Sequence, residues 1–115
     1  MLTIFTPTYN RAYILHQAYK SLCRQTTHDF IWLIVDDGST DETKELVQTW
    51  IEENKISIRY YYQPNGGKMR AHNWGVRLCD TELFVCLDSD DYLVDDAVET
   101  ILTLWNSLEE KQGLA

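Results

Sequence analysis

The chain has 115 residues, of which 44% are hydrophobic, which is enough for one domain with a core and excludes a second domain of ordinary size. Its net charge of -8 excludes general binding to nucleic acids, because that affinity comes from cations on phosphates. Leu2–Thr6 is too short for a signal peptide or a membrane span, so we expect a cytoplasmic protein. Cys23, Cys79 and Cys86 form no C-x-x-C pair, and we expect them to be buried free thiols.

The first third of the chain reads as strand, helix, strand. Leu2–Phe5 is a predicted strand, and Pro7 is expected to end it because proline cannot donate to a ladder. Asn10 can cap a helix over residues 11–24, where apolar residues recur at helical spacing. Phe30–Val35 is the second predicted strand.

The middle of the chain repeats this order. Ser39 or Thr40 can cap a helix that carries Asp41 in its first turn, the favourable charge at that end. Ile56–Tyr62 is rich in β-branched and aromatic residues and predicts a third strand near an edge of the sheet. A Pro-Asn-Gly-Gly turn follows it over residues 64–67.

The last third completes the series. Lys68–Leu78 is a predicted helix in which Gly75 is expected to face a close neighbour, since glycine otherwise costs about 1 kcal/mol there. Leu83–Leu87 is a continuous apolar run that predicts a central strand, and a helix follows over residues 95–108. This order predicts an α/β fold, with a mainly parallel, Rossmann-like sheet of about four strands and helices on both faces.

Two acidic turns follow predicted strands. Asp36 and Asp37 come directly after the second strand, where a capped, solvated turn is the simple interpretation. Caps are already supplied by the residues that follow, so the adjacent carboxylates repel each other without a local reason. A ligand with hydrogen-bond donors would explain why two carboxylates stand next to each other here.

The second acidic turn, L-D-S-D-D, places Asp88, Asp90 and Asp91 after the fourth strand. A helix cap or a calcium loop is the alternative, but the full EF-hand spacing is absent. Asp88 and Asp90 suit Mg²⁺ or Mn²⁺, which takes one or two carboxylates and completes its shell with water and phosphates. Because parallel strands end at one edge of a sheet, both acidic turns are expected to converge on one site.

Two further segments carry candidate ligand contacts. Lys68 and Arg70 lie in the first turn of a helix after two glycines, where cations oppose the helix dipole and indicate a nearby anion. His72 is a candidate ligand or base, but a buried, hydrogen-bonded histidine is the favoured interpretation. After the first strand, Tyr9 can stack on a flat base or pack against apolar neighbours.

The motifs T-P-T-Y-N-R, V-D-D-G-S-T-D, N-G-G-K with Asn73, and L-D-S-D-D occur in an order that resembles the nucleotide-sugar-binding half of family-two glycosyltransferases of GT-A fold. The resemblance spans nearly all of the chain. It implies one nucleotide-sugar-binding domain over residues 1–115, forming the N-terminal part of a larger glycosyltransferase domain. Position 95 is Asp where many relatives have proline, a change expected to be tolerated at a helix start.

The resemblance also implies roles for individual residues. The base pocket is lined by Thr6, Pro7, Thr8 and Tyr9, Asp37 reads the base edge, commonly the uracil N3–H, and Asp36 supports it. Lys68 or Arg70 meets the base or diphosphate, and Asp88 and Asp90 approach the ribose and a Mn²⁺ or Mg²⁺ ion, with Asp90 as the direct ligand.

The implied reaction transfers a sugar, from a UDP-sugar by expectation, to a hydroxyl of a sugar, lipid-linked or protein acceptor with inversion. The general base is expected beyond Ala115, so we expect donor binding without transfer by this chain, self-association through any surface exposed by a missing half, and placement at the inner membrane face through the acceptor. A non-catalytic nucleotide or sugar-nucleotide binding module is the alternative. A metal-dependent phosphohydrolase is less favoured, because Thr6, Pro7 and Thr8 stand where its nucleophilic Asp would lie.

Overall fold

The computed structural model describes residues 1–111, in which four strands and four helices alternate. The elements are β1 (Leu2–Thr8), α1 (Ala12–Cys23), β2 (Phe30–Asp36), α2 (Thr43–Glu53), β3 (Ser57–Tyr62), α3 (Lys68–Leu78), β4 (Leu83–Cys86) and α4 (Ala97–Lys111). The α/β fold is therefore confirmed, with ends that differ from the predicted ones by a few residues. Among the described residues, no helix has the length and apolar character needed to cross a bilayer.

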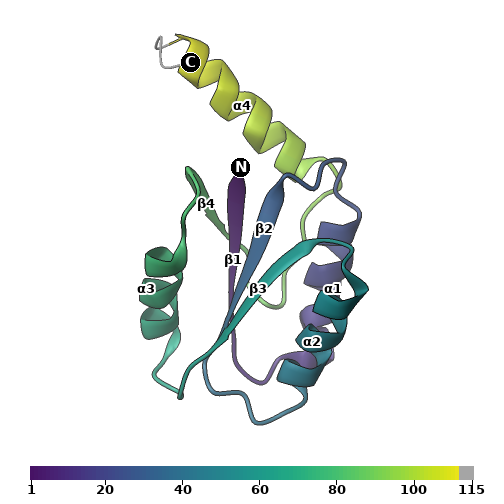
Figure 1. Cartoon of the computed structure of the whole chain (residues 1–115), viewed down its shortest axis with the longest axis vertical. Coiled ribbons are helices and arrows are strands. Elements are labelled where there is room, and N and C mark those ends of the chain that lie inside the picture. Colours follow the sequence, from purple (N-terminus) through teal and green to yellow (C-terminus); the bar gives the residue numbers. More distant parts are fainter. Residues whose placement is uncertain (112–115) are drawn as a thin grey trace.

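The four strands form one parallel sheet in the order β3-β2-β1-β4. Helices α1 and α2 cover one face of this sheet and α3 covers the other (Figure 1). Right-handed crossovers explain the arrangement: the chain steps from β1 to β3 in one direction, then returns past β1 to β4, which places α3 on the opposite face. The direction reverses between β1 and β4, where sheets of this kind open a crevice beyond their carboxyl ends.

The prediction that the fourth strand is central is wrong for these residues, because β4 is an edge strand beside β1. The expected edge position of β3 is confirmed. Strand β4 is apolar because both of its faces are covered. Phe84 packs against apolar residues between the sheet and α3, and Val85 packs against apolar residues between the sheet and helices α1 and α2. The three thiols are free, but none is buried as predicted: Cys23 and Cys79 are half-buried, and Cys86 is exposed because it lies at the end of this edge strand.

Strand β1 continues past its expected end at Phe5 and runs through Pro7 to Thr8. The Phe5 carbonyl accepts the Leu87 N–H at 2.8 Å and the Thr8 carbonyl accepts the Asp37 N–H at 2.8 Å, so alternate residues face β4 and β2. Pro7 faces the β4 side, where an N–H at this position would reach the Leu87 carbonyl in a parallel ladder. The Thr6 hydroxyl donates to that carbonyl at 2.6 Å instead, so the missing N–H leaves no buried carbonyl unpaired and the proline is compatible with the strand.

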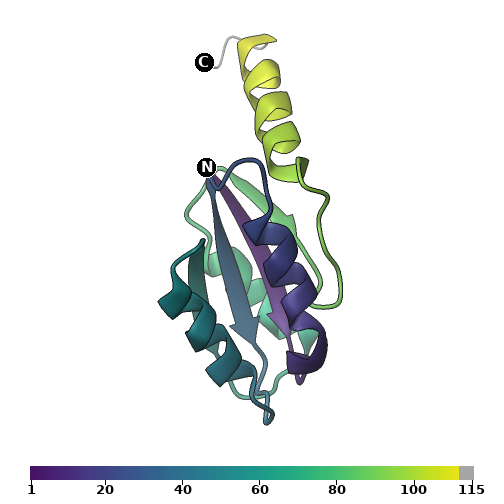
Figure 2. The same ribbon diagram turned by 90° about the vertical axis from the view of Figure 1, so that its right-hand side faces the viewer.

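Two apolar clusters join the layers. The larger lies between the sheet and α1 and α2, where the rings of Tyr19 and Trp50 stack with centroids 4.3 Å apart. Buried Val98 joins α4 to this cluster, and its N–H donates to Gln25 Oε1 at 3.0 Å. From there α4 extends beyond the end of the sheet at which β1 begins (Figure 2).

The smaller cluster, between the sheet and α3, explains the glycine inside that helix. A Cβ at Gly75 would lie 2.3 Å from the Phe5 ring, closer than any real contact. The expected close neighbour of Gly75 is therefore Phe5, whose ring also stacks on Phe84 with centroids 5.4 Å apart. This close approach fixes α3 over β1, and with it the turn that leads into α3.

Candidate functional site

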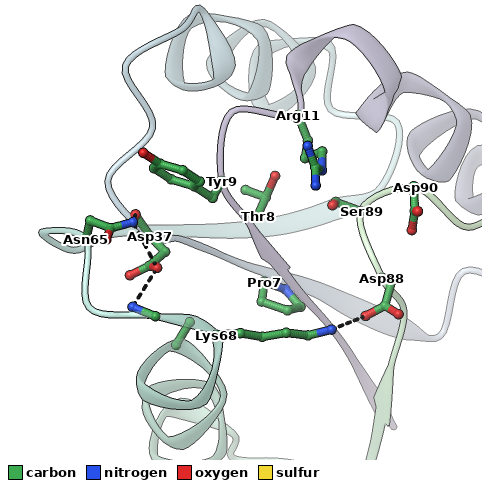
Figure 3. A pocket seen from close by; sticks show the side chains of 12 residues that line it. Pro7, Thr8, Tyr9, Arg11, Asp37, Asn65, Lys68, Asp88, Ser89 and Asp90 are labelled. Carbon is green, nitrogen blue, oxygen red and sulfur yellow. Dashed lines mark hydrogen bonds and ion pairs between the residues drawn. The ribbon is translucent and has the colours of Figure 1, made fainter.

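A cavity of about 420 Å³, called here the first cavity, lies at the carboxyl ends of β1, β2 and β4 (Figure 3). Its walls include Asp37 after β2 and Asp88, Ser89 and Asp90 after β4. The end of β1 and the following loop contribute Pro7, Thr8, Tyr9 and Arg11, and the β3–α3 turn with the start of α3 contributes Asn65, Gly67, Lys68 and Ala71. The two acidic turns thus share one hollow, as the parallel topology predicted.

The carboxylate of Asp37 is buried under hydrogen bonds from the turn that precedes α3. Its Oδ1 accepts from Gln63 Nε2 at 2.7 Å and from the Gly66 N–H at 2.8 Å. Its Oδ2 accepts from the Gly67 N–H at 2.9 Å and from Asn65 Nδ2 at 3.3 Å. Four donors occupy the acceptor positions of a carboxylate, so Asp37 holds the shape of this turn as well as facing the cavity.

Because four donors already fill its acceptor positions, Asp37 cannot hydrogen-bond the edge of a base, as predicted, without a rearrangement. An incoming N–H can reach the carboxylate only if one of the four donors moves. Asn65 makes the longest of the four contacts, and its amide also donates to the Asp37 carbonyl at 3.0 Å, so it keeps a partner when it leaves the carboxylate. Asn65 is therefore the donor that a ligand displaces at the lowest cost.

Asp36 does not reach the cavity, which corrects its expected place beside the base. The side chain is fully buried on the other face of the sheet, where Oδ1 accepts the Ser39 N–H at 2.9 Å and Oδ2 accepts the Tyr60 hydroxyl. Burial and the hydrogen bond to Asp36 raise the pKa of Tyr60 far above its ordinary value of 10.0. Asp36 therefore anchors the turn that presents Asp37.

Thr6 and Thr8, both expected to line the base pocket, differ in position. Thr6 is fully buried, accepts from Trp32 Nε1 at 2.8 Å and donates to the Leu87 carbonyl at 2.6 Å, so it joins β1 to the start of the second acidic turn. Thr8 lines the cavity and is only 3% exposed, yet its hydroxyl has no hydrogen-bond partner among the described residues. A buried hydroxyl of this kind is a ready contact for a ligand.

The loop after β1 is tied to the turn after β2. Asn10 has a positive φ of 52° and its Oδ1 accepts the Thr40 N–H at 2.8 Å. In return, Asp41 Oδ2 accepts the Ala12 N–H at 3.2 Å. Burial alone would raise the pKa of Asp41, but hydrogen bonds from Thr43 and from Ala12 outweigh it and lower the pKa.

These links replace the expected helix caps. The residues at the N-cap positions of α1 and α2 are Arg11 and Glu42, and neither makes a side-chain capping hydrogen bond. The prediction that Asn10, Ser39 or Thr40 caps a helix is therefore wrong. The cross-links instead hold the loop that carries Tyr9 and Arg11 against the first cavity. Arg11, Asn65 and Ser89 line that cavity without having been assigned a role from the sequence, although the position of Arg11 just after a strand was a usable signal.

The acidic turn after β4 forms the open end of the cavity. Asp88, Asp90 and Asp91 are exposed, and each offers a carboxylate oxygen within 4.8 Å of the others. An all-oxygen set of this size suits a hard divalent cation such as Mg²⁺ or Mn²⁺, and Asp91 joins the two residues expected from the sequence. Lys68 Nζ lies 3.5 Å from Asp88 Oδ1 across the cavity (Figure 3). A lysine side chain therefore supplies positive charge next to this turn.

Arg70 does not line the first cavity, which corrects its expected place. It belongs to a separate hollow of about 510 Å³, called the second cavity, together with Tyr62, Asn73, Trp74 and Arg77. His72 is exposed and lines neither cavity, which corrects the favoured interpretation of a buried histidine. Its ring meets the rings of Phe5 and Phe84 edge-on, with centroid distances of 5.6 and 6.1 Å.

Comparison with known proteins gives one consistent family. The model of glycosyl transferase family 2 matches residues 3–111. The chain is 36% identical over 106 residues to validoxylamine A glucosyltransferase of Streptomyces hygroscopicus subsp. jinggangensis, covering 89% of this chain and 25% of that protein. It is 38% identical over 102 residues to chondroitin synthase of Escherichia coli, covering 89% and 15%. The chain thus spans a quarter or less of the length of these curated relatives.

Two solved structures resemble the fold. One is S. aureus TarS 1–349 in complex with UDP-GlcNAc, with a TM-score of 0.83 and 25% identity, covering 92% of this chain and 31% of that one. The other is the mannosyltransferase PcManGT from Pyrobaculum calidifontis in complex with GDP-Man and Mn²⁺, with a TM-score of 0.72 and 28% identity, covering 77% and 27%.

Proposed function

Because this chain belongs to glycosyl transferase family 2, we propose that it is the donor-binding part of a glycosyltransferase and holds a nucleoside-diphosphate sugar in the first cavity. The observation that carries the proposal is the convergence of four chain segments on this one hollow, with an aromatic ring and amides at one end and carboxylates at the other. The sugar nucleotides in the TarS and PcManGT structures support this class of donor.

The base belongs at the end formed by Tyr9 and Asn65. The Tyr9 ring is 46% exposed and offers a flat face for stacking. Uracil presents one N–H between two carbonyls, which complements the Asp37 carboxylate and the Asn65 amide once that amide has moved from the carboxylate to a base carbonyl. The unpartnered Thr8 hydroxyl supplies one more hydrogen bond. We therefore expect UDP to bind better than GDP or CDP.

The diphosphate belongs at the acidic end. The carboxylates of Asp88 and Asp90, with Asp91 in reach, fit a Mn²⁺ or Mg²⁺ ion, which when bound offsets the negative charge of the diphosphate. Lys68 then exchanges its exposed ion pair with Asp88 for a phosphate oxygen, a small cost because such pairs are worth about 1 kcal/mol or less. Arg11, at the cavity wall, adds a second cation for the same charge.

Transfer to an acceptor hydroxyl also needs a general base. In the first cavity Asp37 already accepts four hydrogen bonds, and the carboxylates after β4 are assigned to the cation. We therefore expect this chain to bind the donor and not to transfer its sugar, with inversion at the anomeric carbon as the outcome in the whole enzyme.

Titration calorimetry of the chain with UDP, GDP and CDP, each with and without Mn²⁺, tests this proposal. We expect UDP to bind most tightly and Mn²⁺ to raise its affinity by about tenfold or more, equal to about 1.4 kcal/mol. Absence of binding by all three nucleotides would remove the proposed function. Equal binding of the three would leave a diphosphate site and contradict the reading of the base.

A further inference from the structure

The second cavity has about the size of a ligand site and lies apart from the first. The turn between β3 and α3 separates them, since Gln63 and Pro64 line the second cavity while Asn65 and Gly67 line the first. Four of the second cavity's lining residues, Arg70, Asn73, Trp74 and Arg77, belong to α3. This helix covers the face of the sheet opposite to α1 and α2 (Figure 1). Nothing in the proposed donor site uses the second cavity.

Two guanidinium groups meet at this cavity. Arg70 and Arg77 are seven residues apart on α3 and therefore lie on one face of the helix. Among the described residues neither takes part in an ion pair, although the chain carries a net charge of -8. Two unpaired guanidiniums in one hollow repel each other, and an anionic ligand would remove that repulsion while accepting paired hydrogen bonds.

Arg70 packs against a glycine. A Cβ at Gly66 would lie 2.4 Å from Arg70 Cδ and 2.9 Å from its Nη1. The guanidinium therefore rests against bare backbone of the turn, in space that any other residue at position 66 would fill. Two residues after Lys68, Arg70 points to the opposite side of α3 and lines the second cavity, where it packs against Gly66.

Exposed aromatic rings complete the lining. Trp74 is 41% exposed and Tyr62 is 54% exposed, and Trp74 lies one turn from each arginine on the same helix face. Asn73 adds an amide that donates and accepts. Flat rings that stack on the C–H faces of sugars, an amide for hydroxyls and guanidiniums for carboxylates form a set that complements an acidic carbohydrate.

We propose that the second cavity binds an acidic saccharide, with Trp74 and Tyr62 against its sugar rings and Arg70 and Arg77 on its carboxylates. A nucleic acid strand is disfavoured by the overall negative charge. A free nucleotide shares the chemistry of a flat ring and an anion, and the experiment below separates the two. The proposal does not require donor binding in the first cavity, so either can fail without the other.

The test is calorimetry of the chain with a uronate-containing tetrasaccharide and with the same tetrasaccharide after reduction of its carboxylates to alcohols. We expect the acidic form to bind and the reduced form to bind at least about tenfold more weakly. Saturating UDP with Mn²⁺ should leave saccharide binding unchanged, because the two cavities are separate. No binding of the acidic form, equal binding of the reduced form, or displacement by UDP would each overturn the proposal.

Variants locate the site. Arg70→Gln and Arg77→Gln should each weaken binding of the acidic saccharide by about tenfold. The control Arg24→Gln, at an exposed arginine directly after the C-terminus of α1, should leave that binding unchanged. Trp74→Ala should weaken the acidic and the reduced forms alike. Unchanged binding in the arginine variants would contradict the proposal. High salt should reduce the difference between the two saccharides in the unmodified chain, because it screens the attraction between carboxylates and guanidiniums; a difference that persists would also contradict it.

Discussion

Replacement of Asp37 by asparagine changes one atom in the most densely hydrogen-bonded group of the first cavity. Four donors from the turn before α3 point at its two oxygens. Asparagine keeps one oxygen and presents an NH₂ group in place of the other, so one pair of donors faces a donor. The pair with the longer contacts, the Gly67 N–H at 2.9 Å and Asn65 at 3.3 Å, is the one that the amide will give up.

The expected loss follows from these contacts. A hydrogen bond to a charged acceptor contributes about 1.5–3 kcal/mol, and the bonds that remain lose the charge that strengthened them. Gly67 and Asn65 are exposed, so water can replace part of the lost pairing. We expect Asp37→Asn to lower the free energy of unfolding by about 1.5–3 kcal/mol. We also expect it to weaken UDP binding by about tenfold or more, because the turn carries Asn65 and Gly67 of the cavity wall.

Urea unfolding followed by circular dichroism measures the first effect, and calorimetry with UDP and Mn²⁺ measures the second. Asp29→Asn is the matched control, because it removes the same charge from an exposed side chain outside both cavities and should change stability by less than about 0.5 kcal/mol. An Asp37→Asn variant as stable as the control would show that the carboxylate does not hold the turn.

Three further substitutions probe the cation site, the packing of α3 and the anchor of the first acidic turn. Asp90→Ala should abolish the increase in UDP affinity that Mn²⁺ produces while leaving metal-free binding in place; calorimetry that still shows the increase would mean that this carboxylate does not hold the ion. Gly75→Ala should lower the stability by about 1–3 kcal/mol in thermal melts despite the better helix propensity of alanine, because its Cβ meets the Phe5 ring; a stabilised variant would contradict that contact. Tyr60→Phe should cost about 1–3 kcal/mol by removing a donor from buried Asp36. Because the pKa of Tyr60 is raised in the folded chain, its contribution is complete below the ordinary value of 10.0 and falls as the pH rises above it; stability curves of the two proteins that stay parallel above pH 10 would refute this.

The convergence of the acidic turns could be predicted from the sequence, because parallel strands end at one edge of a sheet whatever their order. The different positions of the Asp36 and Asp37 side chains follow from the pleat of the strand. Successive side chains of a strand point to opposite faces, so Asp36 follows Trp32 and Ile34 toward the face of α1 and α2 while Asp37 turns to the other side. Extending the two-residue period through the end of β2 would have separated the two residues.

Other features depend on distant parts of the chain and left no local pattern. The place of β4 at the edge is set by which strand the chain returns to after α3, and its apolar residues show only that both faces are covered. The separation of Lys68 from Arg70, by contrast, could have been predicted from helical spacing. Both residues lie in the first turn of α3, but residues two apart are about 200° apart around a helix, so they point to opposite sides and line different cavities.

Amide NMR spectra of the chain, recorded during titration with UDP and then with Mn²⁺, can show whether the four segments around the first cavity form one nucleotide-diphosphate site. We expect UDP-induced shifts at Tyr9, Gly66 and Gly67, and strong paramagnetic broadening of the amides of residues 88–91 when Mn²⁺ is added to the UDP complex. Shifts confined to the second cavity, or broadening that spares residues 88–91, would contradict a single nucleotide-diphosphate site.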